Sequence, residues 1–199
     1  MQKLARPREF DVEDALNSAL QVFWTKGYEG TGITDLLEAM QIARGSLYKA
    51  FGDKRNLYLS ALKQYEKNCI EPAVQLLRGK EISDGGQRIR MLFETIILAV
   101  EDDNDRRGCF LCNTAVDQAS HDPDVWKACQ QMMGEMVQGF YCALKDLEDP
   151  EGQDEEVLET RAMSLNVAYN GLRVMVKSGY SPSDIRKTSE RTLTEFGLL

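Results

Sequence analysis

The sequence TDLLEAMQIARGSLYKAFGDK, residues 34–54, contains two short apolar patterns separated by a turn. In the first pattern Leu36 and Met40 lie four residues apart, and in the second Leu47 and Phe51 have the same spacing. Side chains four residues apart share one face of an α-helix, so each pattern predicts a short helix with one buried face.

The residues that flank these patterns are typical of helix ends. Thr34 is expected to cap the first short helix, and Asp53, after the helix-breaking Gly52, is expected to cap a longer helix that begins at Lys54. Two short helices that are joined by a tight turn and followed by a longer helix form a helix-turn-helix.

The second short helix carries polar and cationic side chains opposite its apolar pair. The outward-facing residues are Arg44, Ser46, Tyr48 and Lys49. Gly45 beside them would let the backbone come close to a ligand. Short side chains on a recognition helix suit contact with base edges, and longer polar groups suit phosphate oxygens. The alternative is an ordinary solvated basic face of a surface helix.

The charge of the chain is unevenly distributed. The 199 residues have a formal net charge of −8, yet residues 41–63 contain five Lys or Arg against one Asp or Glu. Residues 1–40 contain four against seven, and residues 64–199 contain fifteen against twenty-four. Lys54 adds its ammonium to the positive end of a helix dipole, where a phosphate is favoured. Because the local field decides whether a polyanion can bind, the basic segment predicts a DNA partner.

Helical periodicity continues through most of the chain, without convincing strand alternation. Asp11 and Gly27 bracket an amphipathic first helix. Turn residues divide the later part of the chain into helices that are expected at residues 73–79, 86–103, 109–120, 123–148, 154–178 and 182–197. The sequence therefore predicts an all-α protein.

The sequences RPREFDVEDALNSALQVFW, residues 6–24, and GYEGTGITDLLEAMQIARGSLYKAFGDKRNLYLSAL, residues 27–62, resemble the N-terminal DNA-binding domain of TetR-family transcriptional repressors. The resemblance covers about residues 6–65, and the Leu-Tyr-x-x-Phe-x-x-Lys core is its most specific part. It implies that Tyr48 and Lys54 contact phosphate oxygens. The implied major-groove contacts are Arg44, Gly45, Ser46 and Lys49, and Thr34 is an implied contact to the DNA backbone.

The resemblance also implies two domains. A three-helix DNA-binding domain is expected at residues 1–53 and a larger helical domain for effector binding and dimerisation at residues 54–199, linked by a helix from residue 54 to about residue 77. In this interpretation a homodimeric repressor binds a palindromic double-stranded DNA operator and is released by an unknown small-molecule effector. A dimer is expected because paired recognition helices must lie about 34–36 Å apart to enter successive major grooves.

Two positions depart from the family pattern. Gln41 lies in the turn where the family usually has glycine, which predicts an altered or strained turn. Gly32 stands where the family often has threonine, so a phosphate contact there is expected to be absent or to pass to Thr31. Arg6 and Arg8 belong either to a flexible arm that reaches a minor groove or to an ordinary charged terminus.

Two apolar sets in the C-terminal part are candidates for dimerisation and for effector binding. The first set predicts a helix-packing seam, either between two subunits or inside one subunit. Its residues are Leu158, Ala162, Leu165, Tyr169, Leu172, Val176, Ile185 and Phe196. The second set combines aromatic and aliphatic side chains with sulfur-containing ones, which suits an adaptable cavity or an ordinary core. Its residues are Phe93, Ile96, Ile97, Cys109, Phe110, Met132, Met136 and Phe140.

Cys109 and Cys112 form a CxxC sequence within RGCFLCN, residues 107–113. These thiols are either buried and inert or part of a sensor in which Arg106, Arg107 and a helix N-terminus make Cys109 reactive. The sequence thus leaves open a repressor that senses oxidants or electrophiles through Cys109 and Cys112. Two alternatives from other classes are a small all-α cysteine-dependent enzyme and an acidic interaction module without a DNA role.

The composition argues against several further classes of protein. Five cysteines, an odd number, indicate reduced thiols, and one histidine with one CxxC leaves a structural zinc site short of ligands, so no metal or cofactor is expected. Neither a membrane span nor a secretion signal is evident, so a cytoplasmic location without a membrane partner is expected. The sequence lacks a Walker loop, HExxH and GxSxG, which predicts that the chain is not an enzyme.

Overall fold

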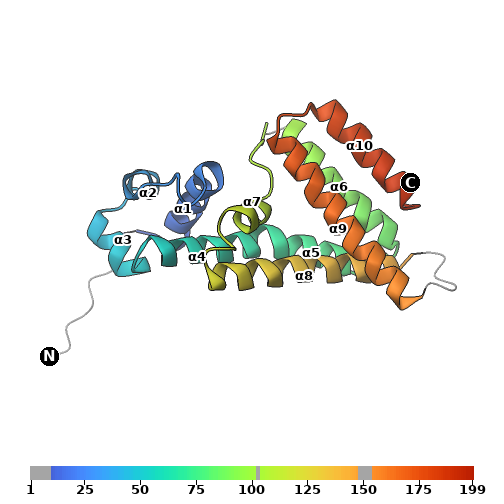
Figure 1. Cartoon of the computed structure of the whole chain (residues 1–199), viewed down its shortest axis with the longest axis horizontal. Helices are drawn as coiled ribbons and strands as arrows, with labels where there is room; N and C mark the ends of the chain where they lie inside the picture. The colour runs from blue at the N-terminus through green and yellow to red at the C-terminus, as the bar shows by residue number, and fades with distance from the viewer. Residues whose placement is uncertain (1–9, 102–103, 148–153) are drawn as a thin grey trace. The chain divides into compact units, whose positions relative to one another are not determined.

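The computed structural model of the chain describes residues 10–101, 104–147 and 154–199 (Figure 1). Within these residues all regular structure is helical and no strand is present, so the predicted all-α fold is confirmed. The α-helices are α1 (Val12–Lys26), α2 (Ile33–Met40), α3 (Arg44–Phe51), α4 (Lys54–Tyr65), α5 (Glu71–Arg78), α6 (Gly85–Glu101), α7 (Phe110–Asp117), α8 (Pro123–Lys145), α9 (Glu155–Lys177) and α10 (Pro182–Glu195). A π-helical segment, η1 (Glu66–Ile70), lies between α4 and α5.

The chain divides into two compact units, unit 1 (Met1–Tyr65) and unit 2 (Glu66–Leu199). The sequence placed this boundary after residue 53 and assigned α4 to the C-terminal domain. In the structure α4 packs against α1 within unit 1, because its apolar residues Leu57 and Ala61 are buried there. Residues 54–78 are helical throughout, as expected for the helix from residue 54 to about residue 77, and the π-helical segment η1 lies between α4 and α5.

In unit 1, α1 packs against α2 and α4, and α3 packs against α4. Phe23 is fully buried, and its ring meets Tyr58 edge-on at a centroid distance of 5.0 Å. Tyr28 packs on the same Tyr58 ring at 4.9 Å, and Trp24 meets Tyr65 edge-on at 5.1 Å. Each edge-to-face pair contributes about 0.5–1.5 kcal/mol beyond the burial of its area, so aromatic packing fixes α1 against α4.

The helix ends of unit 1 follow the sequence with one exception. Asp11 Oδ1 accepts the backbone N–H groups of the first turn of α1, and Asp53 Oδ1 accepts the N–H of Asn56 at 2.7 Å. The expected cap at Thr34 is wrong. Gly32 is the N-cap of α2, and its N–H donates to Asp35 Oδ2 at 2.8 Å, because that carboxylate at the third helical position reaches back to the cap.

In unit 2, α8 packs against α5, α6, α7 and α9, and α10 packs against α6 and α9. The aromatic centre of this unit joins three helices: the rings of Phe93 and Tyr169 lie 5.5 Å apart, and those of Phe140 and Tyr169 lie 6.2 Å apart. None of the helices in the described ranges is both long and apolar enough to cross a membrane.

A buried arginine joins α5, α6 and α8 in unit 2. Arg88 is 1% exposed, and its Nη1 donates to the carbonyl oxygens of Leu77 at 2.8 Å and Gly79 at 2.6 Å. Its Nη2 donates to Asp146 Oδ2 at 2.6 Å. Burial alone would raise the pKa of Asp146, but hydrogen bonds from Lys80 and Arg88 outweigh it and lower that pKa.

The start of α6 approaches the end of α8 closely. The N–H of Gly85 donates to the carbonyl of Asp146 at 3.0 Å. A Cβ atom at Gly85 would lie 1.7 Å from the carbonyl oxygen of Ala143. Glycine is therefore required here for packing space.

Candidate functional site

The turn between α2 and α3 is held in a left-handed conformation. Gln41 has φ 53° and ψ 40°, and its N–H donates to the carbonyl of Glu38 at 3.3 Å. A residue with a Cβ atom is disfavoured in this region by about 1–2 kcal/mol. The strain expected from the replacement of a turn glycine by Gln41 is therefore present, and the helix-turn-helix forms in spite of it.

The face of α3 that carries the predicted DNA contacts is open to solvent. Leu47 is fully buried beneath it, and Tyr48 is 43% exposed. The residues of the predicted set that are exposed are Thr34, Arg44, Gly45, Tyr48 and Lys49, and Ser46 is half-buried. The four-residue spacing of Leu47 and Phe51 thus orients the helix as expected.

Gly45 and Lys54 add two further properties to this face. Among the described residues, no atom beyond the α3 backbone and the chain neighbours of Gly45 lies within 4 Å of the place where a Cβ would stand, so the backbone there is accessible to another molecule. The Lys54 Nζ lies 4.3 Å from the centroid of the Tyr28 ring, a cation–π contact that holds the ammonium at the start of α4.

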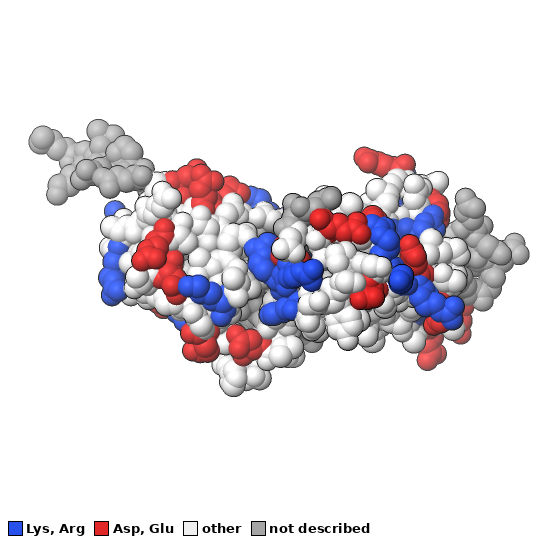
Figure 2. Space-filling model, turned by 90° about the horizontal axis from the view of Figure 1, so that it is seen from above, with Lys and Arg blue, Asp and Glu red and all other residues white. Residues whose placement is uncertain are grey.

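The N-terminus of α3 is available to an anion. No side chain caps it, and no acidic residue lies in its first turn. A helix N-terminus of this kind favours negative charge through its backbone N–H groups and its dipole. Figure 2 shows blue side chains at the edge of unit 1 where Figure 1 places α3, and blue and red side chains are interspersed over the rest of the visible faces of both units.

Thr31 does not join the exposed set. It is 1% exposed, and its Oγ1 donates to the carbonyl of Gly27 at 2.6 Å. The expected phosphate contact by its hydroxyl is therefore not supported, because that hydroxyl is used inside unit 1. Arg6 and Arg8 lie outside the described residues.

The apolar seam predicted for dimerisation lies inside the subunit. Its residues on α9 and the first one on α10 are at most 7% exposed in the single chain: Leu158, Ala162, Leu165, Tyr169, Leu172, Val176 and Ile185. Phe196 is half-buried. The seam packs against α6, α8 and α10, so it is not available to a second subunit.

A different face of α9 exposes apolar side chains. Val157, Met163, Val167 and Val174 are 50%, 60%, 67% and 53% exposed. Gly171 lies between the last two, and among the described residues no atom beyond the local α9 backbone is within 4 Å of its Cβ position. Several of these residues are three, four or seven positions apart, so they share a stripe along the helix.

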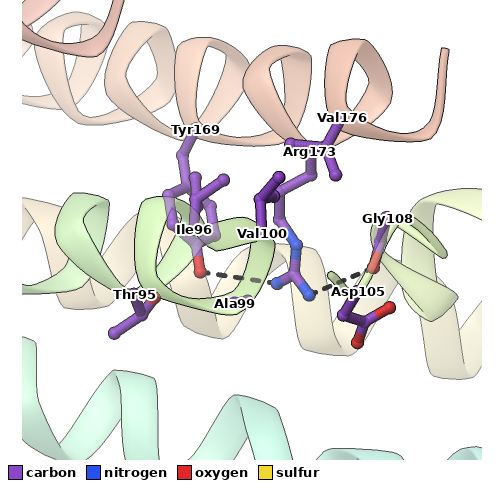
Figure 3. Close-up of a pocket in the computed structure, with 9 residues that line it drawn as sticks. All are labelled: Thr95, Ile96, Ala99, Val100, Asp105, Gly108, Tyr169, Arg173 and Val176. Carbon is purple, nitrogen blue, oxygen red and sulfur yellow. Dashed lines mark hydrogen bonds between the residues drawn. The ribbon is translucent and has the colours of Figure 1, made fainter. Parts of the chain in front are cut away.

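Unit 2 contains a cavity of about 70 Å³ between α6, α9 and the chain that precedes α7 (Figure 3). Its lining residues are Thr95, Ile96, Ala99, Val100, Asp105, Gly108, Tyr169, Arg173 and Val176. Arg173 donates to Tyr169 Oη at 3.4 Å and to the carbonyl of Gly108 at 3.3 Å, as Figure 3 shows. A hydrogen bond from Arg107 lowers the pKa of Asp105, and the nearby Arg173 charge adds to this effect.

A second cavity of about 10 Å³ shares Tyr169 and Arg173 with the first. It is also lined by Cys69, Cys109 and Met136. Ile96, Cys109 and Met136 of the predicted pocket thus line cavities. The other predicted pocket residues are buried in the core: Phe93, Ile97, Phe110, Met132 and Phe140.

The sequence does not predict the polar residues that line the cavity of about 70 Å³. Asp105, Gly108 and Arg173 come from a loop and a helix that are distant in sequence. No spacing rule connects them.

Cys109 is the N-cap of α7, and its Sγ accepts the N–H of Cys112 at 3.4 Å. The Cys112 thiol donates to Asn170 Oδ1 on α9 at 3.1 Å. The expected helix N-terminus is therefore present at Cys109, while Arg107 pairs with Asp105 at 2.7 Å. In the part of the chain that the structure describes, no three His, Cys, Asp or Glu side chains are grouped to hold a metal ion.

Comparisons with known proteins agree with this geometry. A family model for "Bacterial regulatory proteins, tetR family" matches residues 15–61. The uncharacterised HTH-type transcriptional regulator YezE of Bacillus subtilis is 33% identical over 157 residues, which cover 77% of this chain and 80% of the relative. The HTH-type transcriptional repressor ComR of Escherichia coli is 26% identical over 193 residues, 94% of this chain and 90% of the relative.

A similar solved structure is that of a cysteine mutant of the TetR family transcriptional regulator CifR in complex with 26-bp double-strand operator DNA. It has a TM-score of 0.79 and 28% identity, and the match covers 95% of this chain and 98% of that one. The likeness thus extends beyond the helix-turn-helix into unit 2.

Proposed function

The chain belongs to the TetR family of DNA-binding transcriptional regulators, and from this premise we propose that it is a homodimeric repressor that a small-molecule effector releases from its operator. The observation that carries the proposal is the exposed face of α3, where Arg44, Tyr48 and Lys49 stand over the fully buried Leu47. CifR, a similar regulator, has been solved with operator DNA, which supports duplex DNA as the partner.

The proposed contacts are of two kinds: contacts that position the protein on the DNA backbone and contacts that recognise the base sequence. Tyr48 and Lys54 bind phosphate oxygens, and Thr34 makes a further contact with the DNA backbone. The base-reading residues are Arg44, Gly45, Ser46 and Lys49. Phosphate contacts fix the orientation of the helix, and contacts to base edges select the sequence.

The proposed dimer uses the exposed stripe on α9. Val167 and Val174 present apolar area to solvent, and Gly171 between them leaves room for a close approach. A two-fold axis makes one patch complementary to itself, so a single stripe is sufficient for an isologous interface. Such a dimer would present two α3 helices to the two halves of a palindromic operator.

The proposed effector site is the cavity around Arg173 and Tyr169 in unit 2. An effector can shift the protein away from the DNA-bound state only by its difference in affinity for the two states. The proposed route from the site to the DNA is the chain from η1 to α4, because α4 begins with Lys54.

DNA titration over a series of salt concentrations tests the proposal. The operator is first obtained by selection of bound sequences from random DNA. Lys54→Ala is expected to weaken binding to all sequences alike and to reduce the slope of log K against log salt by about one. Arg44→Ala is expected to relax the preference for particular bases.

Lys187→Ala, which removes an exposed lysine from α10, is the matched control and should bind DNA as the parent does. The proposal fails if the parent ignores duplex DNA at low salt. It also fails if Lys187→Ala changes the salt slope as much as Lys54→Ala.

A further inference from the structure

Two thiols in unit 2 lie one helical turn apart at the start of α7. Cys109 is the N-cap and Cys112 is the third helical residue. Cα atoms one turn apart on a helix are separated by about 5–6 Å, which lies within the range of disulfide bonds. The hydrogen bond from the Cys112 N–H at 3.4 Å shows that the Cys109 Sγ points back over this turn. A disulfide can therefore close here with small movements.

The surroundings give the two thiols different roles. The neighbouring Cys109 and burial raise the pKa of Cys112, so this residue remains a neutral thiol, and its proton is donated to Asn170 Oδ1. The Cys109 sulfur accepts the backbone N–H of Cys112 in the first turn of α7. Cys109 stands at the N-terminus of α7, and a helix N-terminus favours the thiolate form of a cysteine, which is the nucleophile.

The remaining thiols near this site are less suited to react. Burial raises the pKa of Cys69, and burial raises the pKa of Cys129 to about 11. Both are therefore neutral near pH 7 and poorly suited to the first attack on peroxide, which needs a thiolate. Its place at the N-terminus of α7 makes Cys109 the first candidate for attack, and Cys112, one turn away, is the second partner.

The cavities limit the size of the reagent. Cys109 lines the cavity of about 10 Å³, which shares Tyr169 and Arg173 with the cavity of about 70 Å³. The first has room for about one water-sized molecule, whereas benzene occupies an apolar cavity of about 150 Å³. Hydrogen peroxide is close to water in size and matches the cavity at Cys109, whereas an aromatic electrophile is larger than this cavity.

We propose that Cys109 and Cys112 form a peroxide-sensing dithiol that closes to a disulfide within α7 and thereby weakens operator binding. The part of this proposal that concerns operator binding, its regulatory half, rests on the proposed repressor function. The part that concerns disulfide formation, its chemical half, does not.

The reaction balances in two steps. The Cys109 thiolate attacks one oxygen of hydrogen peroxide, so that an S–O bond forms, the O–O bond breaks and the departing hydroxide takes a proton to leave as water. The Cys112 sulfur then attacks the Cys109 sulfur, an S–S bond forms, the S–O bond breaks, and the second water leaves with the Cys112 proton. Two thiols are oxidised by two electrons and one peroxide is reduced to two waters.

The disulfide changes a contact between α7 and α9. Oxidation removes the Cys112 proton, so the hydrogen bond to Asn170 Oδ1 is lost. Asn170 keeps its bonds to Asn166, at 2.9 Å and 3.1 Å, within α9. The attachment of α7 to α9 thus depends on the oxidation state, and α9 carries the stripe proposed for dimerisation.

The test treats the full chain with hydrogen peroxide and maps disulfides by mass spectrometry of unreduced peptides. The expected product is the Cys109–Cys112 disulfide, and its formation should lower operator affinity about tenfold, reversibly on reduction. Cys109→Ser and Cys112→Ser should form no such disulfide and should retain operator binding in peroxide. Serine at the N-cap still accepts the first-turn N–H, so Cys109→Ser is expected to fold.

Cys142→Ser, at a half-buried thiol on α8, is the matched control and should respond to peroxide as the parent does. A disulfide between Cys69 and Cys109, or no disulfide, overturns the assignment of the pair. Formation of the Cys109–Cys112 disulfide without a change in operator affinity overturns the regulatory half. If the reduced parent binds no DNA, the proposed function fails, while the disulfide map still decides the chemistry.

Discussion

A substitution at Gly45 distinguishes the effect of an added side chain on protein stability from its effect on DNA binding. In the described part of the chain, a Cβ there meets no atom within 4 Å beyond the local α3 backbone, so Gly45→Ala introduces no clash. Alanine favours a helix over glycine by up to about 1 kcal/mol, and the free energy of unfolding should rise by that amount. Operator affinity should fall about tenfold, because the methyl group would stand between the backbone and the base edges. Chemical denaturation and DNA titration measure the two effects.

Gly134→Ala is the matched control for this substitution. Gly134 lies in α8 and is also exposed, with no atom within 4 Å of its Cβ position. It should gain similar helix stability and leave operator binding unchanged. Equal DNA affinity of Gly45→Ala and the parent would contradict a close backbone approach at Gly45.

The sequence predicts the outward face of α3 because the spacing of Leu47 and Phe51 fixes which side is buried. It fails at Thr31, since burial of that short hydroxyl depends on the path of the chain around Gly27. It also fails at Arg173, whose partner Gly108 lies in a distant loop. Local periodicity carries no information about such contacts.

At the scale of elements, Arg88 joins the end of α5 to the end of α8. Arg88→Met keeps an apolar stem but leaves the carbonyls of Leu77 and Gly79 without this donor and removes an ion-pair partner from Asp146. Loss of one partner from a buried pair costs about 3–5 kcal/mol, so a decrease of about 3 kcal/mol in the free energy of unfolding is expected. Urea denaturation followed by circular dichroism measures it.

Arg191→Met provides the comparison, because Arg191 forms an exposed pair with Glu195 four residues later on α10. Exposed pairs of this kind contribute about 0.3–0.5 kcal/mol. Similar losses in both variants would show that Arg88 does not hold the helices together.

Most helices were predictable because their starts carry recognisable caps. Asp122 accepts the N–H groups of Asp124 and Val125, and Ser181 accepts that of Asp184, and Asp and Ser are residue types preferred at helix N-caps. The π-helical segment η1 was not predicted, because it has no cap and no breaking residue. The buried seam of α9 was recognised as apolar, but periodicity does not tell whether the partner is the same chain or another one.

At the scale of the whole molecule, the exposed stripe of α9 predicts the oligomeric state. Val167→Glu places a carboxylate on a valine that is 67% exposed, so the fold should be kept while self-association is lost. Analytical ultracentrifugation should find a monomer, and affinity for a palindromic operator should fall because two half-sites are no longer bound together.

Val116→Glu makes the same change at a valine of α7 that is 87% exposed and lies outside the stripe. It should sediment as the parent does. A dimeric Val167→Glu would exclude this face of α9 as the interface.

Acid should destabilise the protein through paired carboxylates. A hydrogen bond from Arg107 lowers the pKa of Asp105, and hydrogen bonds to Asp146 lower its pKa against the opposing effect of burial. A carboxylate with a lower pKa in the folded state contributes stability above its unfolded pKa of about 4, and loses it as the pH falls through the folded value. The free energy of unfolding should therefore decline below about pH 4.

Urea denaturation of the parent and of Asp105→Asn across this range checks the prediction. The variant should be less stable near pH 7 and should lose less stability on acidification. If the free energy of unfolding of the two proteins depends on pH in the same way, Asp105 does not contribute to the loss of stability in acid.

The packing of Trp24 against Tyr65 in unit 1 gives the protein an intrinsic optical reporter. The chain has two tryptophans, and the other, Trp126 in α8, is 53% exposed. Indole emission shifts to longer wavelength when a shielded ring becomes hydrated, so the spectral change on heating arises mainly from Trp24. Ellipticity at 222 nm instead reports all helices, and most of the helical residues belong to unit 2. Non-coincident melting curves from the two signals would show that the DNA-binding unit loses its structure as a separate cooperative step.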